Sequence, residues 1–158
     1  MGIVVIFEPQ EIEAVLLKVV DLFLIPRFKE LNMRASGEWE ESLEVVAEQN
    51  KGVIRGRHYS EQLAKGREGG SLPPVEAIEK WVKVKFGLSG KEARQRAWAI
   101  AKKIEQSGTT HYQKGGTDLL EVLEEPRVML FLQEELGSIA RVKIADQLRR
   151  NAKNILEK

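Results

Sequence analysis

The stretch from Gly56 to Thr109 constrains the fold more than any other part of this 158-residue chain. It begins with a glycine-rich basic connector, passes through Pro73-Pro74, and continues as two amphipathic patterns that end at Gly108. Proline in the first turn of a helix loses no backbone hydrogen bond, and glycine just past the last turn accepts a left-handed conformation. The stretch therefore predicts a connector followed by two helices.

The two predicted helices differ in the size of their apolar residues. The first begins near Pro74, ends at Gly87 and has a large apolar face: Val75, Ile78, Trp81 and Val82. The second follows Ser89, a suitable N-cap with Glu92 in capping-box spacing. Its face is rich in small residues, which lets another backbone approach closely: Ala93, Ala97, Ile100, Ala101 and Ile104.

The connector from Ser60 to Leu72 holds three glycines and two cationic residues after Leu63. A loop of this length is uncommon in a compact domain and is usually functional or disordered. It differs from a phosphate-binding loop, because it lacks the Gly-Lys-Ser/Thr ending and does not run from a buried strand into a helix. We expect residues 60–72 to form a long extended loop.

On the N-terminal side, Ile3 to Phe7 is β-branched and is open to two interpretations, a short strand or the lead-in to a helix. From Pro9 to Phe23, apolar residues recur every three or four positions, which predicts a helix. Pro26 is expected to kink or end this helix, and the segment around Gly37 to terminate it.

A period of two follows, which predicts a half-buried strand: Trp39, Leu43, Val45 and Ala47 alternate with polar residues. The turn residues from Asn50 to Gly52 then allow Val53 to Tyr59 to return as its partner in a β-hairpin. In such a strand Arg55 and Arg57 project from the same face, near Glu40 and Glu44 across the hairpin.

The C-terminal third predicts a polar loop over 109–116, one or two helical turns over 119–123, and a long helix over 126–158 that is set at the periphery. Its later turns are strongly basic: Arg141, Lys143, Arg149, Arg150 and Lys153. The predicted fold class is α+β, with helices packed on a small antiparallel sheet or hairpin. The length predicts a single domain over residues 1–158.

Composition excludes several kinds of site. The chain has no cysteine, which removes disulfides, thiolate zinc sites and a cysteine nucleophile. A net charge of +1 gives no global attraction to nucleic acid, so any basic surface is local. The most apolar run, Ala14 to Ile25, carries Lys18 and Asp21 and is too short to span a bilayer, so no membrane role is expected.

Few residues suit catalysis. His58 and His111 have no partners at metal-binding spacing, and the serines lack a nucleophile motif. A cluster of acidic residues is best explained as a solvated helix face: Glu121, Glu124 and Glu125. We therefore expect no catalytic, cofactor or metal site, and no enzyme.

One polar cluster has two interpretations. It is either a phosphate-binding face with Tyr59 as a stacking aromatic or a solvated sheet face whose charge is balanced by glutamates. The second arrangement is the more frequent one. It comprises Arg55, Arg57, His58, Lys65 and Arg67.

A string of motifs runs through the organising stretch: Arg57-His58-Tyr59-Ser60, Gly66 to Val75, Ile78-Glu79-Lys80-Trp81-Val82, Ala97 to Ile104, and Gly108-Thr109. This string resembles the neck and tail-completion proteins of tailed bacteriophages, which act in head-tail joining. Their recurrent elements are an aromatic residue, a Gly-Arg loop, a Pro-Pro-Val helix start, an Ile-x-x-Trp-Val helix and an alanine-rich helix ending in Gly-Thr. Gly69 stands where that family often has proline. The match covers about residues 55–110.

The resemblance implies a structural virion protein at the head-tail junction, a neck, connector or tail-completion ring, made in the host cytoplasm. Its partners would be further copies of itself, the portal, adaptor, stopper or tail proteins beside it, and DNA in the channel; no cofactor is implied. The alternative is a small nucleic-acid-binding regulator that uses a basic hairpin or the C-terminal helix.

In the virion hypothesis three groups of residues have roles. The first is a subunit-contact loop: Lys65, Gly66, Arg67, Gly69, Gly70, Leu72, Pro73 and Pro74. The second is a set of helix anchors: Ile78, Trp81, Trp98 and Ile100. The third is a basic group that faces the DNA channel or a partner: Arg55, Arg57, Lys65 and Arg67.

Overall fold

The computed structural model describes residues 2–156. Helices make up most of this part, with one two-stranded antiparallel sheet and a long C-terminal helix, so the α+β prediction is confirmed. Contacts within the chain divide its described part into two compact units. Unit 1 comprises residues 2–24, 44–55 and 121–156, and unit 2 comprises residues 25–43 and 56–120. The single domain expected from the chain length stays a prediction.

The first helical segment begins at Pro9, as predicted, and passes through Pro26. It consists of α1 (Pro9–Val19), one π-helical turn, η1 (Val20–Leu24), and α2 (Ile25–Glu30). A proline inside a helix clashes with the carbonyl four residues earlier and offers it no hydrogen bond. The wider π-helical turn falls directly before Pro26, which is where such a mismatch is relieved.

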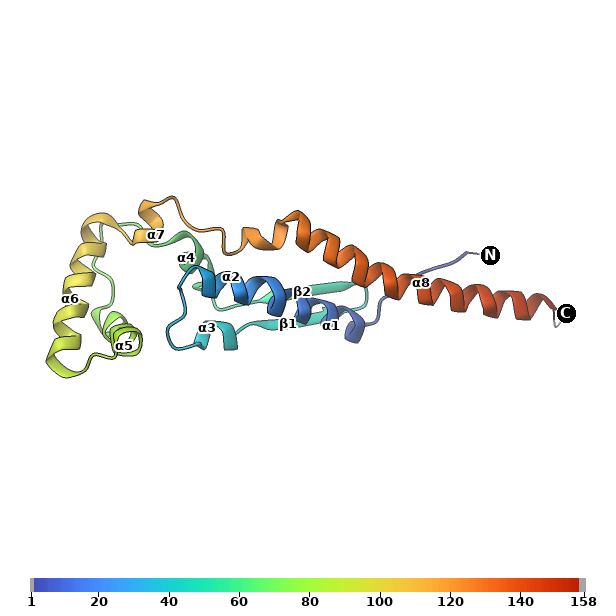
Figure 1. Ribbon diagram of the computed structural model, residues 1–158, viewed down its shortest axis with the longest axis horizontal. Helices are drawn as coiled ribbons and strands as arrows, with labels where there is room; N and C mark the ends of the chain where they lie inside the picture. Colours follow the sequence, from blue (N-terminus) through green and yellow to red (C-terminus); the bar gives the residue numbers. More distant parts are fainter. Residues whose placement is uncertain (1, 157–158) are drawn as a thin grey trace. The chain divides into compact units, whose positions relative to one another are not determined.

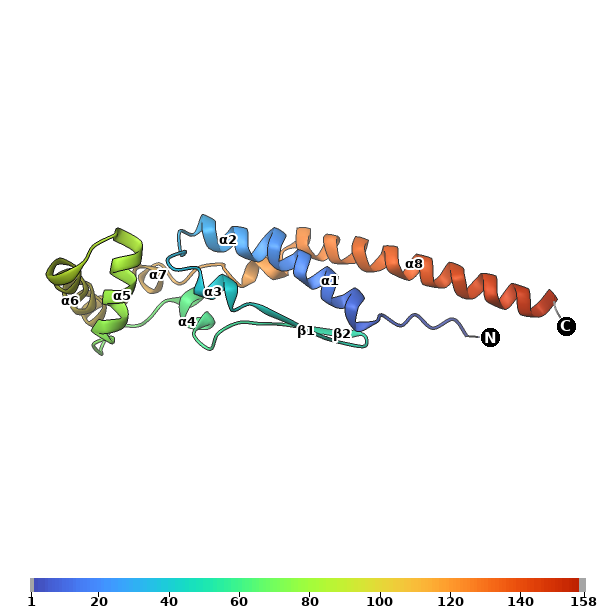
Figure 2. The same ribbon diagram turned by 90° about the horizontal axis from the view of Figure 1, so that it is seen from below.

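In unit 1, α1 covers a short hairpin. The strands β1 (Glu44–Glu48) and β2 (Lys51–Arg55) pair antiparallel, with Glu44 opposite Arg55, and the hairpin is confirmed. The loop between them includes Asn50, which has a φ of 59°. Figure 1 and Figure 2 both show α1 lying along the hairpin. The helix approaches so closely that a Cβ on Gly52 would meet Leu16 and Ile12.

Beside the hairpin and α1, unit 1 contains a further helical segment. A 3-10 turn, η2 (Glu121–Glu124), precedes α8 (Pro126–Leu156), and Val122 and Val128 are buried there. The ring of Phe131 lies edge to face against Phe23, with 5.4 Å between the centroids. The turn near 119–123 and the long C-terminal helix are thus as predicted. Although α8 has 31 residues, no helix of the described chain is both long enough and apolar enough to cross a membrane.

Residues 2–8 form neither helix nor strand, so of the two interpretations of Ile3 to Phe7 the lead-in is correct. The segment is held along α8, because Gln147 Nε2 donates to the Val4 carbonyl at 2.5 Å and Lys143 Nζ donates to the Ile6 carbonyl at 2.6 Å. Lys143 also pairs with Glu11 at 2.7 Å. This hydrogen bond, with a backbone bond at Glu8, lowers the pKa of Glu11.

Unit 2 is built around a helical pair. Besides α2, its helices are α3 (Glu38–Glu41), α4 (Ser60–Lys65), α5 (Val75–Phe86), α6 (Gly90–Ser107) and α7 (Thr110–Gln113). The pair is α5 and α6, and the small residues Ala93 and Ala97 pack against Val82 at its centre. Ser89 holds the N-cap position of α6, but its side chain makes no capping hydrogen bond, so the predicted capping box is absent.

Three further predictions for unit 2 are wrong. Trp39 lies in α3 instead of a strand, because its ring stacks on Phe28 at 4.5 Å and its Nε1 donates to Ser60 Oγ at 3.0 Å. Residues 60–65 of the expected loop form α4. The polar segment after Gly108 contains α7, which Thr109 caps by accepting a hydrogen bond from the Tyr112 amide at 3.3 Å.

We predict that Gly52→Ala lowers the free energy of unfolding by about 1–2 kcal/mol, because the added methyl group overpacks the contact with α1. The matched control is Gly137→Ala in α8, where a Cβ meets nothing within 4 Å. Alanine is the better helix former, so that variant should gain up to about 1 kcal/mol. Urea unfolding of both variants measures the difference. Equal effects would contradict the close approach of α1 to Gly52.

Candidate interaction surface

The connector that follows α4 is attached to the junction between α6 and α7. The amide of Arg67 donates to Thr109 Oγ1 at 2.9 Å, and the amide of Thr109 donates back to the Arg67 carbonyl at 2.8 Å. Farther along, the Gly70 amide donates to the Glu105 carbonyl at 2.7 Å. Residues 66–70 of the expected extended loop are therefore a packed part of unit 2.

Two glycines make this attachment possible. Gly66 has a φ of 80°, and a Cβ there would meet the backbone of Tyr112 and lie 2.6 Å from Thr109 Oγ1. Gly108 has a φ of 75°, and its Cβ would lie 2.7 Å from the Arg67 carbonyl. Any other residue at Gly66 or Gly108 would face both an unfavourable backbone conformation and a backbone clash.

A side-chain contact also joins the connector to α7. The Tyr112 hydroxyl hydrogen-bonds Glu68 on the connector, and this bond raises the pKa of Tyr112 above its usual 10.0, with the negative charge of Glu68 acting in the same direction. Because the hydroxyl must keep its proton to donate, ionisation of the phenol breaks the contact. The connector is therefore held by backbone and side-chain bonds together.

Beside this junction a groove of about 570 Å³ opens. Its lining is mainly apolar and comes from α5, α6 and the start of α7: Pro74, Ala77, Ile78, Trp81, Ile100, Lys103, Ile104, Gly108, Thr109, Thr110 and His111. Lys103 and His111 are its titratable lining residues. A groove of this size and polarity accepts apolar side chains of a peptide or protein more readily than a charged ligand.

The predicted helix anchors fall into two groups. Ile78 and Ile100 are partly buried and pack against Val82 and its neighbours. Trp81 and Trp98 are 39% and 43% exposed, so these two predicted anchors are not buried within the pair. Trp81 instead lies edge to face against the exposed ring of Phe86, at 5.3 Å between centroids. The α5–α6 pair thus carries aromatic rings on its outside.

The rest of the predicted contact loop surrounds the start of α5. Pro74 is the N-cap residue of α5 and Pro73 is buried, whereas Gly70 and Leu72 are exposed. Gly69 lies against α6, since a Cβ there would be 3.0 Å from the Gly108 amide. At the C-terminal end of the connector, residues 70–72 are all exposed.

The predicted basic residues are divided between the two units. Arg55 ends β2 in unit 1 opposite Glu44, and β2 ends before Arg57, so the shared strand face expected for these two arginines is wrong. Arg57, Lys65 and Arg67 belong to unit 2. Lys65 Nζ pairs with Glu61 at 2.7 Å, and Arg67 donates to Ser71 Oγ at 3.0 Å.

Neither histidine belongs to a set of potential metal ligands among residues 2–156. The ring of His58 packs edge to face on Tyr59, and His111 lines the groove. Over residues 2–156, no group of three or more histidine, aspartate or glutamate side chains is arranged to hold a metal ion. The features of unit 2 that suit binding are the groove and the exposed aromatic rings beside it.

Sequence reasoning missed Thr109, Tyr112 and the groove. One signal was present, because Gly108 followed by threonine is a helix stop joined to an N-cap, which predicts a new helix at residue 110. Nothing in the local sequence joins Glu68 to Tyr112, since the two residues meet only through the tertiary fold.

Comparisons with models of protein families, with curated proteins and with solved structures give no match for this chain. Its function is therefore inferred from its own residues and motifs.

We predict that Gly66→Ala lowers the free energy of unfolding by about 3 kcal/mol, from backbone strain plus the clash with Tyr112. Gly70→Ala is the matched control: its φ is 107°, but a Cβ there meets nothing within 4 Å. It should cost about 1 kcal/mol, from strain alone. Chemical denaturation measures both values. A cost at Gly66 no larger than that at Gly70 would show that the connector is not attached as described.

We also predict that Tyr112 ionises above its ordinary pKa and that Glu68→Ala lowers this pKa toward 10.0, because the hydrogen bond and the nearby charge are removed together. The chain has two tyrosines, so both titrations are made in a Tyr59→Phe background. Ultraviolet absorbance between pH 8 and 13 gives each pKa. Since the folded-state pKa is the higher one, the stability from this contact is complete below the unfolded pKa and is lost as the pH rises through the folded one.

Proposed function

We propose that this chain is a structural virion protein of a tailed bacteriophage that acts in a homo-oligomeric ring at the head-tail junction, as a neck, connector or tail-completion protein. One observation carries the proposal. All the motifs that resemble this family lie in unit 2, where they build one packed module with exposed tryptophans. A module that keeps large aromatic rings in water is suited to bind another protein.

Internal packing explains many of the residues in these motifs. The glycines allow the connector to meet α6, the prolines start α5, and the alanines of α6 admit Val82. It does not explain the exposure of Trp81 and Trp98 or the groove beside Trp81. Exposed apolar surface is unfavourable unless a partner covers it. These features support a contact role for unit 2.

In this proposal the partners are further copies and the adjoining portal, adaptor, stopper or tail proteins. The end of the connector, from Gly70 to Leu72, is exposed beside the start of α5 and supplies the loop contact. The exposed Arg55 and Arg57 meet channel DNA or an acidic partner.

The test uses phage particles produced with variant copies of this chain. Trp98→Glu places a charge on the proposed contact surface and should reduce the yield of joined particles by about tenfold or more, with free heads and tails accumulating. Gln95→Glu adds the same charge at another exposed position of α6 and should leave the yield unchanged. Electron microscopy counts the particles, and circular dichroism verifies that both variants fold.

A genome lacking the gene decides the proposal most directly. It should yield unjoined heads and tails, whereas joined, infectious particles without this chain, verified by mass spectrometry, would contradict the virion role. The regulator alternative predicts tight duplex-DNA binding by the purified chain that falls steeply between low and moderate salt. Fluorescence anisotropy of wild type and Arg150→Ala measures that binding.

A further inference from the structure

The second half of α8 has its polar face turned inward. Residues at one side of the helix meet the N-terminal segment: Lys143 and Gln147 bond its backbone, and Asp146 and Arg150 line a hollow with Val4, Ile6 and Glu8. In an ordinary amphipathic helix the apolar side faces the rest of the protein. Here hydrophilic side chains occupy that position.

The apolar residues of this half lie on the other side of the helix. They recur at spacings of three and four and form what we call the α8 stripe: Val142, Ala145, Leu148, Ala152 and Ile155. Val142, Leu148 and Ile155 are each more than half exposed. Figure 1 shows this half of α8 projecting past α1 and the hairpin of its own unit. Among the described residues of unit 1, the large side chains of the α8 stripe therefore remain mostly uncovered.

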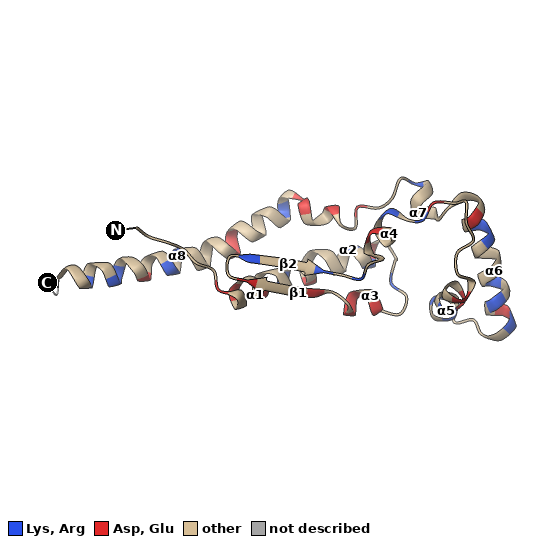
Figure 3. Cartoon of the chain, turned by 180° about the vertical axis from the view of Figure 1, so that it is seen from behind, with Lys and Arg blue, Asp and Glu red and all other residues tan. Residues whose placement is uncertain are grey.

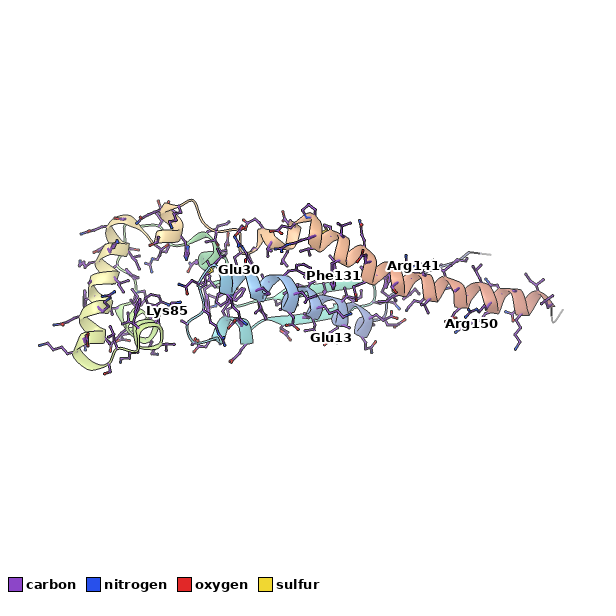
Figure 4. All side chains as sticks on the ribbon, viewed as in Figure 1. Glu13, Glu30, Lys85, Phe131, Arg141 and Arg150 are labelled. Carbon is purple, nitrogen blue, oxygen red and sulfur yellow. The ribbon has the colours of Figure 1, made fainter. Side chains whose placement is uncertain are left out.

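The charges around the α8 stripe indicate what would cover it. Residues 141–156 carry five cationic side chains and one acidic side chain. The basic residues recur along this half in Figure 3, and Figure 4 shows Arg150 on the projecting part. Packing two such helices together would bring like charges close, which disfavours an α8–α8 pair. The complementary partner is an apolar surface with acidic residues.

The chain itself offers such a surface on the first helical segment of unit 1. The side of α1 and η1 away from the hairpin exposes Glu13, Ala14, Leu17 and Asp21, which we call the α1 outer face. Leu17 is 46% exposed and is flanked by the two acidic residues. Lys18, which follows Leu17 in the chain, is paired with Glu135 at 2.6 Å. An apolar centre with acidic flanks is the complement of the α8 stripe.

We propose that the α8 stripe of one copy packs against the α1 outer face of a second copy. At 1.5 Å per residue the α8 stripe runs for about 20 Å and the α1 outer face, from Glu13 to Asp21, for about 12 Å, so the α1 outer face covers part of the stripe. The two surfaces are different, so each copy uses its α8 stripe to bind one neighbour and its α1 outer face to bind another. Such a contact between unlike surfaces of identical chains is heterologous. Contacts of this kind close into rings when the rotation between copies allows it.

A single seam of this length is smaller than a standard protein interface, so the contact between two copies is weak and ring closure strengthens it. The inference rests on the proposed function for the expectation that copies associate. It is tested separately, because the virion role is decided in particles, whereas this contact is decided with the purified chain alone.

The experiment uses two variants that each remove one surface. Leu148→Glu disrupts the α8 stripe, and Leu17→Lys disrupts the α1 outer face; both residues are exposed, so both variants should fold. Sedimentation velocity over a concentration series should show self-association of the wild type, weakened about tenfold or more in either variant. Asn154→Glu adds the same charge to another exposed position of α8 and should associate like the wild type.

Mixing the variants decides the geometry. In an equimolar mixture, the intact α8 stripe of Leu17→Lys meets the intact α1 outer face of Leu148→Glu, so a one-to-one complex should form that grows no further. An α8–α8 contact would instead leave Leu17→Lys self-associating alone, and this would overturn the inference.

Two further outcomes would overturn it. One is a wild type that stays monomeric at the highest concentration reached. The other is binding to vesicles containing anionic phosphatidylserine, lost in Leu148→Glu, without self-association, which would assign the α8 stripe to a membrane surface.

Discussion

The exchange of hydrogen bonds between Arg67 and Thr109 is the constraint on which unit 2 depends. It ties the connector to the point where α6 ends and α7 begins. The connector then leads to Pro73-Pro74 at the start of α5, which packs against α6. The groove beside Trp81 is formed by these two helices and the junction. A segment that the sequence predicts to be a long extended loop is thus packed beside the proposed contact surface.

The two units pack their helices by different means. In unit 2 the alanines of α6 bring α5 close, which leaves the larger aromatic residues on the outside. In unit 1 a glycine in the hairpin, Gly52, allows α1 to lie directly on the sheet. In both units, small residues lie at the contact between a helix and the element that it packs on. Large apolar residues remain exposed in each unit, among them Trp98 and Leu148.

This distribution connects the two proposals. A ring subunit must have a surface for its own copies and another for the proteins above or below it, and exposed apolar residues on two separate units fit that division. The aromatic side of α5 and α6 is the candidate for foreign partners, and the α8 stripe with the α1 outer face is the candidate for the contact between copies. The inward polar face of α8 frees its apolar face for that use.

The sequence alone determined the hairpin and the ends of several helices, because these follow from local chemistry: Pro9, Pro74, Gly87 and Gly108 act within a few residues of themselves. It also determined the α+β class. Only the tertiary structure decided that Trp39 belongs to a helix, since burial against Phe28 outweighs a period-two pattern. The tertiary structure likewise decided that the connector is attached, through contacts between residues some forty positions apart. Which side of α8 faces inward depends on the N-terminal segment more than a hundred residues away, and no local pattern carries that information.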